Sequence, residues 1–210
     1  MTPKPIVLAT RNTGKLREIR AVLGDLPVEV ASLEAWPDLP EPVEDGETFA
    51  ANARLKARYY AQATGCWALA DDSGLAVDAL NGAPGVYSAR FAADSVPAGS
   101  ERQTIDQANN DKLLASLADV PDARRTARFL CYMALAEGDR VLLEADGKVE
   151  GRIAHAPAGG NGFGYDPLFF VPQFGCTTAE MTPEQKNAIS HRGQAVRSFA
   201  EALEGLLEQG

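Results

Sequence analysis

The sequence predicts an α/β fold with a mixed β-sheet, and three patterns support this prediction. Wholly apolar runs at residues 6–9 and 67–70 are typical of buried strands. Strong helix formers fill residues 48–63. Late in the chain, residues 126–136 and 141–149 flank a Glu-Gly-Asp segment, which is the pattern of a β-hairpin. Strands and helices therefore intermix along the chain.

The other elements follow from capping residues and apolar spacing. Thr48 and Gly65 suit the two ends of the helix at 48–63, and the TPEQ segment at 182–185 is a capping-box helix start. No repeat, linker or low-complexity tract divides the chain, so we expect one domain over residues 1–210. We also expect a helix at 16–23 that ends at Gly24, helices at 100–117 and 196–206, strands at 28–31 and 168–171, and loops at 36–42 and 81–85.

Composition and charge exclude several classes of protein. The 210 residues are 45% hydrophobic and 23% charged, which is ordinary for a globular chain. With 20 basic and 29 acidic residues the net charge is −9, so the chain repels a nucleic-acid backbone. No apolar run approaches the roughly 20 residues of a membrane-spanning helix. Three cysteines without a CxxC pair indicate no zinc site or disulfide framework and fit a reducing cytoplasm. We expect neither nucleic acid nor a membrane as a partner.

The first candidate site lies between the first strand and the first helix. A helix N-terminus offers unpaired N–H groups and a positive dipole end, which suit phosphate, and a lysine here adds a full charge. Leu16 stands where a Walker A loop has Ser or Thr, so the segment is not of that type. A phosphate site and an ordinary capped turn fit the residues equally well. The segment consists of Thr10, Arg11, Asn12, Thr13, Gly14 and Lys15.

The second candidate is the pair Asp71 and Asp72, followed by Ser73 and Gly74. We expect a sharp turn here, at the end of the buried strand at 67–70. Adjacent carboxylates repel each other unless a cation is near, and carboxylate oxygens are ligands that Mg²⁺ prefers or groups that can act as a general base. The alternative is an Asx turn with one solvated aspartate. A nearby acidic loop supplies either a further metal ligand or only a solvated surface, and its residues are Glu41, Glu44, Asp45 and Glu47.

The third candidate is the glycine-rich loop that contains Phe163, Gly164, Tyr165 and Asp166. Aromatic rings separated by glycine can stack on a base, because glycine allows close approach. Asp166 can accept hydrogen bonds from ring N–H groups. The alternative is a bulged turn whose rings complete the core.

The fourth candidate is a group of donors just before the last predicted helix, namely Lys186, Ser190, His191 and Arg192. Their cationic side chains suit the carbonyl oxygens of a base or the oxygens of phosphates. Adjacent Ser190 and His191 without a GxSxG elbow do not indicate a serine nucleophile. His155 lies in a loop and is assigned no role.

Taken together, these segments resemble the inosine/xanthosine triphosphate pyrophosphatase family. The matching stretches are LATRNTGK, LADDSGLAVDALNGAPGVYSARF, GFGYDPLF and SHRGQA, which follow the family's order and span nearly the whole chain. Any one of them alone is a weak signal, and four in order are specific. The resemblance implies an elongated mixed sheet flanked by helices, two lobes with a nucleotide-binding groove between them, and a homodimer.

The resemblance also implies a reaction with Mg²⁺ as cofactor. Water attacks the α-phosphorus of ITP, dITP or XTP and releases the monophosphate and pyrophosphate, which keeps these nucleotides out of DNA and RNA. Asp72 would be both general base and metal ligand, with Glu44 as a second metal ligand. The segment from Thr10 to Lys15, with Lys56, would hold the triphosphate. The implied nucleoside contacts are Ser73, Phe163 as the stacking ring, Gly164, Tyr165, Asp166, Lys186, His191 and Arg192.

Base selectivity has a physical basis in this assignment. A 6-keto purine presents an acceptor that donors such as Arg192 or His191 can satisfy, whereas adenine presents an amino donor at the same position. A site that depends on buried hydrogen bonds rejects such a mismatch strongly. Guanine shares the 6-keto group, so that rejection of GTP requires its 2-amino group or kinetics.

One departure from the family pattern is Ala51, where related chains commonly have Glu in T-F-x-E-N-A. We interpret the missing carboxylate as a lost capping-box partner of Thr48, which costs a fraction of the ~1 kcal/mol of a typical cap. The alternative is a weaker contact around the metal.

Three other functions fit parts of the sequence. They are a pyrophosphatase for pyrimidine or modified-base triphosphates, a phosphatase that releases orthophosphate from the γ position, and a nucleotide sensor without turnover. The intact pair Asp71 and Asp72 argues against the sensor. Competition between bases and the identity of the product distinguish the first two.

Overall fold

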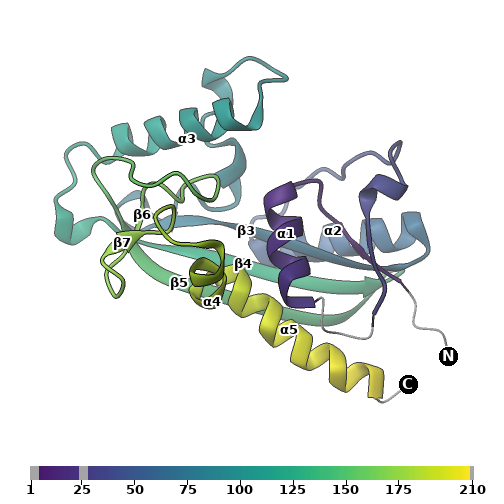
Figure 1. Ribbon diagram of the computed structural model, residues 1–210. Helices are drawn as coiled ribbons and strands as arrows, with labels where there is room; N and C mark the ends of the chain where they lie inside the picture. The colour runs from purple at the N-terminus through teal and green to yellow at the C-terminus, as the bar shows by residue number, and fades with distance from the viewer. Residues whose placement is uncertain (1–4, 24–27, 209–210) are drawn as a thin grey trace. The chain divides into compact units, whose positions relative to one another are not determined.

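Seven strands form one mixed sheet in the computed structural model, which describes residues 5–23 and 28–208 (Figure 1). The strands are β1 (Ile6–Leu8), β2 (Val30–Ser32), β3 (Trp67–Val77), β4 (Thr126–Glu137), β5 (Arg140–Ile153), β6 (Phe169–Val171) and β7 (Cys176–Thr177). Their order in the sheet is β2-β1-β3-β4-β5-β6-β7. β1 pairs in parallel with β2 and β3, whereas β6 pairs antiparallel with β5 and β7. The prediction of an α/β fold with a mixed sheet is confirmed.

Capping residues mark the ends of α2 and the start of α4 among the α-helices. They are α1 (Thr13–Leu23), α2 (Phe49–Thr64), α3 (Arg102–Ser116), α4 (Pro183–Ile189) and α5 (His191–Glu208). Thr48 caps α2 by accepting from the Ala51 N–H, and Gly65 ends it with a φ of 69°. The capping box at the start of α4 is present. The predicted end of α1 at Gly24 lies outside the described residues. Within the described part of the chain, no helix is long and apolar enough to cross a membrane.

The chain divides into two compact units. Unit 1 consists of Met1–Asp72, Cys131–Gly147 and His191–Gly210, and unit 2 of Ser73–Leu130 and Lys148–Ser190. Strands β3, β4 and β5 therefore contribute residues to both units. A single functional domain over the whole chain stays a prediction.

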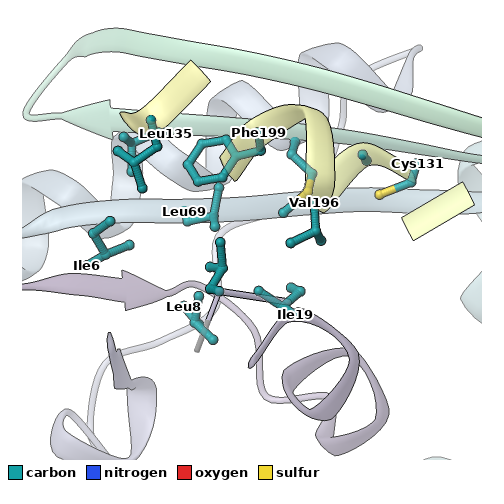
Figure 2. Close-up of a cluster of buried hydrophobic side chains, with 12 residues drawn as sticks. Ile6, Leu8, Ile19, Leu69, Cys131, Leu135, Val196 and Phe199 are labelled. Carbon is teal, nitrogen blue, oxygen red and sulfur yellow. The ribbon is translucent and has the colours of Figure 1, made fainter. Parts of the chain in front are cut away.

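Unit 1 has a helix layer on each face of its strands. Side chains alternate between the two faces along a strand. Ile6, Leu8 and Leu69 lie on the face covered by α1 and α5, where Ile19 and Val196 belong to the same buried cluster (Figure 2). The intervening residues of these strands lie on the opposite face, which α2 covers.

The face toward α2 is built largely from alanine. Small side chains leave little separation between a helix and a sheet, so the polar ends of longer side chains on α2 can reach the strands. The buried alanines are Ala53, Ala57 and Ala61 on α2, Ala68 and Ala70 on β3, and Ala134 and Ala136 on β4.

Unit 2 has its own apolar core, which joins α3 to strand residues. Leu113 of α3 and Leu117, which directly follows the helix, are fully buried, and Leu114 packs against the same cluster. The aromatic rings of Phe129 and Phe169 lie 4.4 Å apart between centroids. This core supports the glycine-rich loop that precedes β6.

Candidate active site

The expected turn at Asp71 and Asp72 is wrong, because β3 continues through both residues to Val77. Asp and Gly are poor strand formers, which is why this segment has the sequence pattern of a turn. In a strand, however, successive side chains point to opposite faces. Asp71 lies on the face of Leu69, toward α1 and α5, and Asp72 lies on the alanine face toward α2. The Asx-turn alternative is wrong for the same reason.

Asp71 is fully buried between two cations. Its Oδ2 lies 2.8 Å from Nζ of Lys15 on α1 and 3.4 Å from Nε of Arg192 on α5. Arg192 also pairs with Glu18 of α1. Burial alone would raise the pKa of Asp71, but the charges of Lys15 and Arg192 outweigh it and hold this pKa far below its usual range. Asp71 is therefore a permanent anion that holds α1 and α5 to the strand.

Asp72 has a different environment on the other face. Its Oδ1 lies 3.1 Å from Nζ of Lys56, and its Oδ2 accepts from Nδ2 of Asn52 at 3.1 Å. Burial and the charge of Glu44 raise the pKa of Asp72 above its usual value, although Lys56 and Lys15 act against the shift. A carboxylate with a raised pKa is a better proton acceptor than an ordinary aspartate, which suits a general base.

Lys56 joins the acidic loop to this centre. Its Nζ lies 3.2 Å from Oε1 of Glu44, so the Glu44 side chain is not simply solvated. Burial lowers the pKa of Lys56, but the charges of Asp72, Asp71 and Glu44 outweigh it, and the net shift is upward. Lys56 is thus a buried, permanently charged ammonium, and the carboxylates of Glu44 and Asp72 both face it.

Asn52 is a further candidate site residue, which the sequence reasoning missed. It is fully buried, and while its amide nitrogen donates to Asp72, its Oδ1 accepts from the backbone N–H of Gly46 at 2.8 Å. A Cβ added at Gly46 would lie 2.5 Å from that Oδ1, so only glycine allows this approach. Asn52 and Lys56 are four residues apart on α2, and this i, i+4 spacing was the available signal.

The segment before α1 combines a helix cap with cationic groups. Oδ1 of Asn12 accepts from the N–H groups of Gly14 and Lys15, at 2.9 and 3.2 Å, which is the pattern of an N-cap. The Asn12 N–H in turn donates to Oγ1 of Thr10. Arg11 donates to the carbonyl of Leu39 and so contacts the proline-rich loop at 36–42. The capped-turn alternative therefore describes Asn12, and a role in phosphate binding stays a prediction for the segment as a whole.

The carboxylates of Glu44 and Asp72 fit a metal ion that shares its ligands with a phosphorylated substrate. Both face one cationic group, the ammonium of Lys56. Mg²⁺ usually takes one or two carboxylates from the protein when phosphates supply other ligands. Between residues 5 and 208, leaving out 24–27, no group of three or more His, Cys, Asp or Glu side chains could hold a metal by itself.

The glycine-rich loop of unit 2 is held by Asp166, which is buried. Its Oδ2 accepts from the Phe163 N–H at 2.8 Å and from Nζ of Lys186 at 2.6 Å, and its Oδ1 accepts from Thr178 at 2.9 Å. The ammonium of Lys186 lies 4.7 Å from the centroid of the Phe163 ring. Asp166 and Lys186 thereby fix the position of Phe163.

Tyr165 belongs to the core of unit 2, so the core alternative holds for this ring. It is 5% exposed, and its hydroxyl donates to the carbonyl of Ser88 at 2.9 Å. Burial raises its pKa well above the usual range. Phe163, in contrast, is only half-buried.

The structure separates the predicted residues into two groups. His191 and Arg192 lie in the first turn of α5, not before it, and both are buried. In unit 1 are Thr10, Arg11, Asn12, Thr13, Gly14, Lys15, Glu44, Lys56, Asp72, His191 and Arg192. In unit 2 are Ser73, Phe163, Gly164, Tyr165, Asp166 and Lys186.

Comparisons with known proteins find close relatives over almost the whole chain. A model of the Ham1 family matches residues 6–202. A dITP/XTP pyrophosphatase of Streptomyces coelicolor is 49% identical over 204 residues, which is 96% of this chain and 98% of that protein. One from Geobacter sulfurreducens is 52% identical over 198 residues, or 94% and 96%. The solved structure of a HAM1 protein from Coxiella burnetii is 42% identical with a TM-score of 0.84, and the match covers 96% of this chain and 99% of that one.

Proposed function

Because the chain belongs to the Ham1 family, we propose that it hydrolyses ITP, dITP and XTP to the monophosphate and pyrophosphate. The chain is a nucleoside triphosphate pyrophosphatase, a hydrolase that acts on a phosphoric anhydride. It removes non-standard purine nucleotides from the pool before they enter DNA and RNA. The observation that supports this chemistry best is the buried Asp72, with its raised pKa, beside Lys56 and Glu44.

In the proposed step, Asp72 acts as the general base. It accepts a proton from water at a carboxylate oxygen while the water oxygen attacks the α-phosphorus. The new P–O bond forms as the bond from the α-phosphorus to the bridging oxygen breaks, and pyrophosphate leaves with that oxygen. Asn52 holds Asp72 in place through its 3.1 Å hydrogen bond, and Lys56 keeps a positive charge beside it.

Glu44 and Asp72 would hold Mg²⁺ together with phosphate oxygens of the substrate. When bound, the ion would neutralise charge that develops on the leaving pyrophosphate. The segment from Thr10 to Lys15 would bind the triphosphate, with the hydroxyls of Thr10 and Thr13 as neutral donors. Lys15 pairs with Asp71 in the structure, so its role as the cation requires it to satisfy that carboxylate as well.

Unit 2 would recognise the nucleoside. Phe163 would stack on the purine, because its half-buried ring is held by the Asp166 and Lys186 contacts. Ser73, Gly164, Tyr165, Asp166 and Lys186 would be further contacts of the nucleoside in unit 2. The resemblance also implies that His191 or Arg192 would supply donors to the 6-keto group. Arg192 pairs with Asp71 and Glu18 in the structure, so this role requires it to satisfy those carboxylates as well.

The proposed oligomeric state rests on the family resemblance, and the proposed compartment rests on the cysteines. We propose a homodimer, which light scattering of the purified chain tests directly. The three cysteines are free thiols, which supports a reducing compartment such as the cytoplasm.

Product analysis tests the proposed function. The chain is incubated with Mg²⁺ and ITP, XTP, GTP, ATP or dUTP separately, and pyrophosphate and orthophosphate are both measured. We expect pyrophosphate and monophosphate from ITP and XTP, with far less product from the others. Orthophosphate as the first product, or tight binding without turnover, would contradict the proposal in favour of a phosphatase or a sensor.

A further inference from the structure

The peptide groups of Gly164 are bound on both sides by one helix. The Gly164 N–H donates to Oδ2 of Asp106 at 2.9 Å, and the Gly164 carbonyl accepts from Nδ2 of Asn110 at 3.0 Å. Asp106 and Asn110 are one turn apart on α3, so both side chains project from the same face of the helix. The backbone of Gly164 has a φ of 62°, a conformation that costs energy for most residues and that these two bonds help to hold.

Asp106 is itself held in position. Arg102, one turn earlier on α3, lies 2.9 Å from Oδ1 of Asp106, while Oδ2 is directed to Gly164. The side chain of Asn110 is buried. Asp106, which has a second partner, and Asn110, whose side chain is buried, therefore bind the N–H and the carbonyl of Gly164 from one helix.

The two hydrogen bonds from α3 to Gly164 add to the contacts that the loop makes within itself. Asp166 holds Phe163 twice, because its side chain accepts from the Phe163 N–H and its own backbone N–H donates to the Phe163 carbonyl at 3.3 Å, whereas the N–H and the carbonyl of Gly164 are bound by α3. Phe163 precedes Gly164 directly and Tyr165 follows it. A shift of the Gly164 peptide would consequently tilt the Phe163 ring.

Asn109 gives α3 a second contact with the surroundings of the loop. Its Oδ1 accepts from the Ala92 N–H at 2.7 Å, and its Nδ2 lies 3.4 Å from the carbonyl of Ser88. The same Ser88 carbonyl accepts from the hydroxyl of Tyr165. The helix therefore fixes both the backbone of the loop and the segment on which the Tyr165 ring is anchored.

We propose that Asp106 and Asn110 are positioning residues that set base selectivity by fixing the Gly164 peptide and, through it, the Phe163 ring. The inference rests on the proposed function, in which this ring stacks on the purine. Neither residue touches the reacting phosphates in this assignment. Their loss should therefore impair discrimination between bases more than the chemical step.

The test compares kcat/KM for ITP, GTP and ATP in the wild type and in four variants. Asp106→Ala removes the acceptor, and Asp106→Asn restores an acceptor without the charge. Asn110→Asp keeps the size but replaces the donor by a carboxylate that repels the Gly164 carbonyl. The control is Asp111→Asn, which changes an exposed carboxylate on the same helix that accepts from Gln107 one turn earlier. Thermal unfolding midpoints report the folded state of each variant.

We expect Asp106→Ala and Asn110→Asp to lower the ratio of kcat/KM for ITP to that for ATP by about fivefold or more, mainly through KM, since each loses a part-buried hydrogen bond to Gly164. Asp106→Asn should recover most of the ratio, and Asp111→Asn should keep it. A merely structural role would lower activity on all nucleotides in proportion, and an unchanged ratio in a folded variant that has lost activity would overturn the inference. If the wild type itself releases no pyrophosphate from ITP, the proposed function fails instead.

Discussion

Asp71 and Asp72 are neighbours in sequence, yet their carboxylates have pKa values shifted in opposite directions. The strand places them on opposite faces of the sheet, where Asp71 meets Lys15 and Arg192 and Asp72 meets Asn52 and Lys56. The pKa of Asp71 is lowered and that of Asp72 is raised. One carboxylate is thereby suited to a structural role and the other to proton transfer.

Asp72→Asn should abolish turnover and leave the fold intact. The change removes the proposed base and one metal ligand, but it keeps the shape of the side chain and an oxygen that can accept from Asn52. We expect a loss of kcat of at least about 10²–10⁴-fold, the range for general base catalysis, with an unfolding midpoint no lower than that of the wild type. Pyrophosphate release and thermal unfolding measure the two effects. Near-normal activity would rule out Asp72 as the base.

The pH dependence of kcat/KM should report the raised pKa of Asp72. The base must be ionised, so the rate should increase with pH through an apparent pKa above the ~3.9 of an ordinary aspartate. The profile is measured with ITP at several Mg²⁺ concentrations and extrapolated to low Mg²⁺, because a bound divalent cation would lower the pKa of a ligating carboxylate. An acid limb at or below pH 3.9 would be inconsistent with the buried environment of this carboxylate.

Asp71→Asn should destabilise the fold at neutral pH and make the free energy of unfolding depend less on pH in the acid range. The lowered pKa of Asp71 contributes stability that is present above the unfolded value of about 3.9 and is lost as the pH falls toward the folded value. Breaking this buried pair costs about 3–5 kcal/mol, because Lys15 and Arg192 lose their shared anion. Urea unfolding between pH 3 and pH 7 measures both effects, and an unchanged slope below pH 4 in the variant would contradict the assignment.

Asn52→Ala should reduce activity more than it reduces stability. The change leaves Oδ2 of Asp72 and the Gly46 N–H without their partner, so that both the base and the loop carrying Glu44 lose a fixed position. We expect kcat/KM to fall by roughly 10–100-fold and the Mg²⁺ concentration for half-maximal activity to rise. Asn161→Ala, which removes a hydrogen bond to the Met181 carbonyl in unit 2, is the control and should leave the Mg²⁺ dependence unchanged.

Arg192→Ala should separate a base-reading role from a structural one. If Arg192 reads the 6-keto group, KM for ITP should rise while kcat/KM for ATP changes little. Because the guanidinium also pairs with Asp71 and Glu18, we expect a fall in the unfolding free energy of about 3–5 kcal/mol as well. An equal loss of activity on every nucleotide would leave only the structural role.

Local patterns were sufficient to predict most of the helices and strands. Thr48, Gly65 and the capping box at Thr182 act within a few residues, so sequence spacing alone identifies them. The extension of β3 beyond Asp72 was not predictable in this way. Aspartates in a strand need cations from other elements, and the lysine partner of Asp71 is contributed by α1 while that of Asp72 is contributed by α2. Such pairings depend on tertiary packing rather than on spacing.

The candidate site was likewise predictable only where a local pattern or the family resemblance pointed to a residue. The resemblance implies roles for both Asp72 and Lys56, and in the structure the carboxylate and the ammonium lie 3.1 Å apart. The roles of these residues in binding and catalysis stay predictions. The helical spacing of Asn52 and Lys56 could have identified Asn52 as a partner of Asp72. The hydrogen bond between Asp106 and Gly164 joins residues 58 positions apart, so no local sequence pattern predicts it.

The alanines between α2 and the strands make the ionisation of the active site sensitive to residues that carry no charge. Lys56 and Asn52 reach Asp72 because nothing larger than a methyl group at Ala57, Ala68 or Ala70 separates the helix from the sheet. A single added methylene in that layer would move two charged groups apart without touching either. Inactive variants can therefore arise at positions that a search for polar or titratable residues would pass over, and they would still be folded.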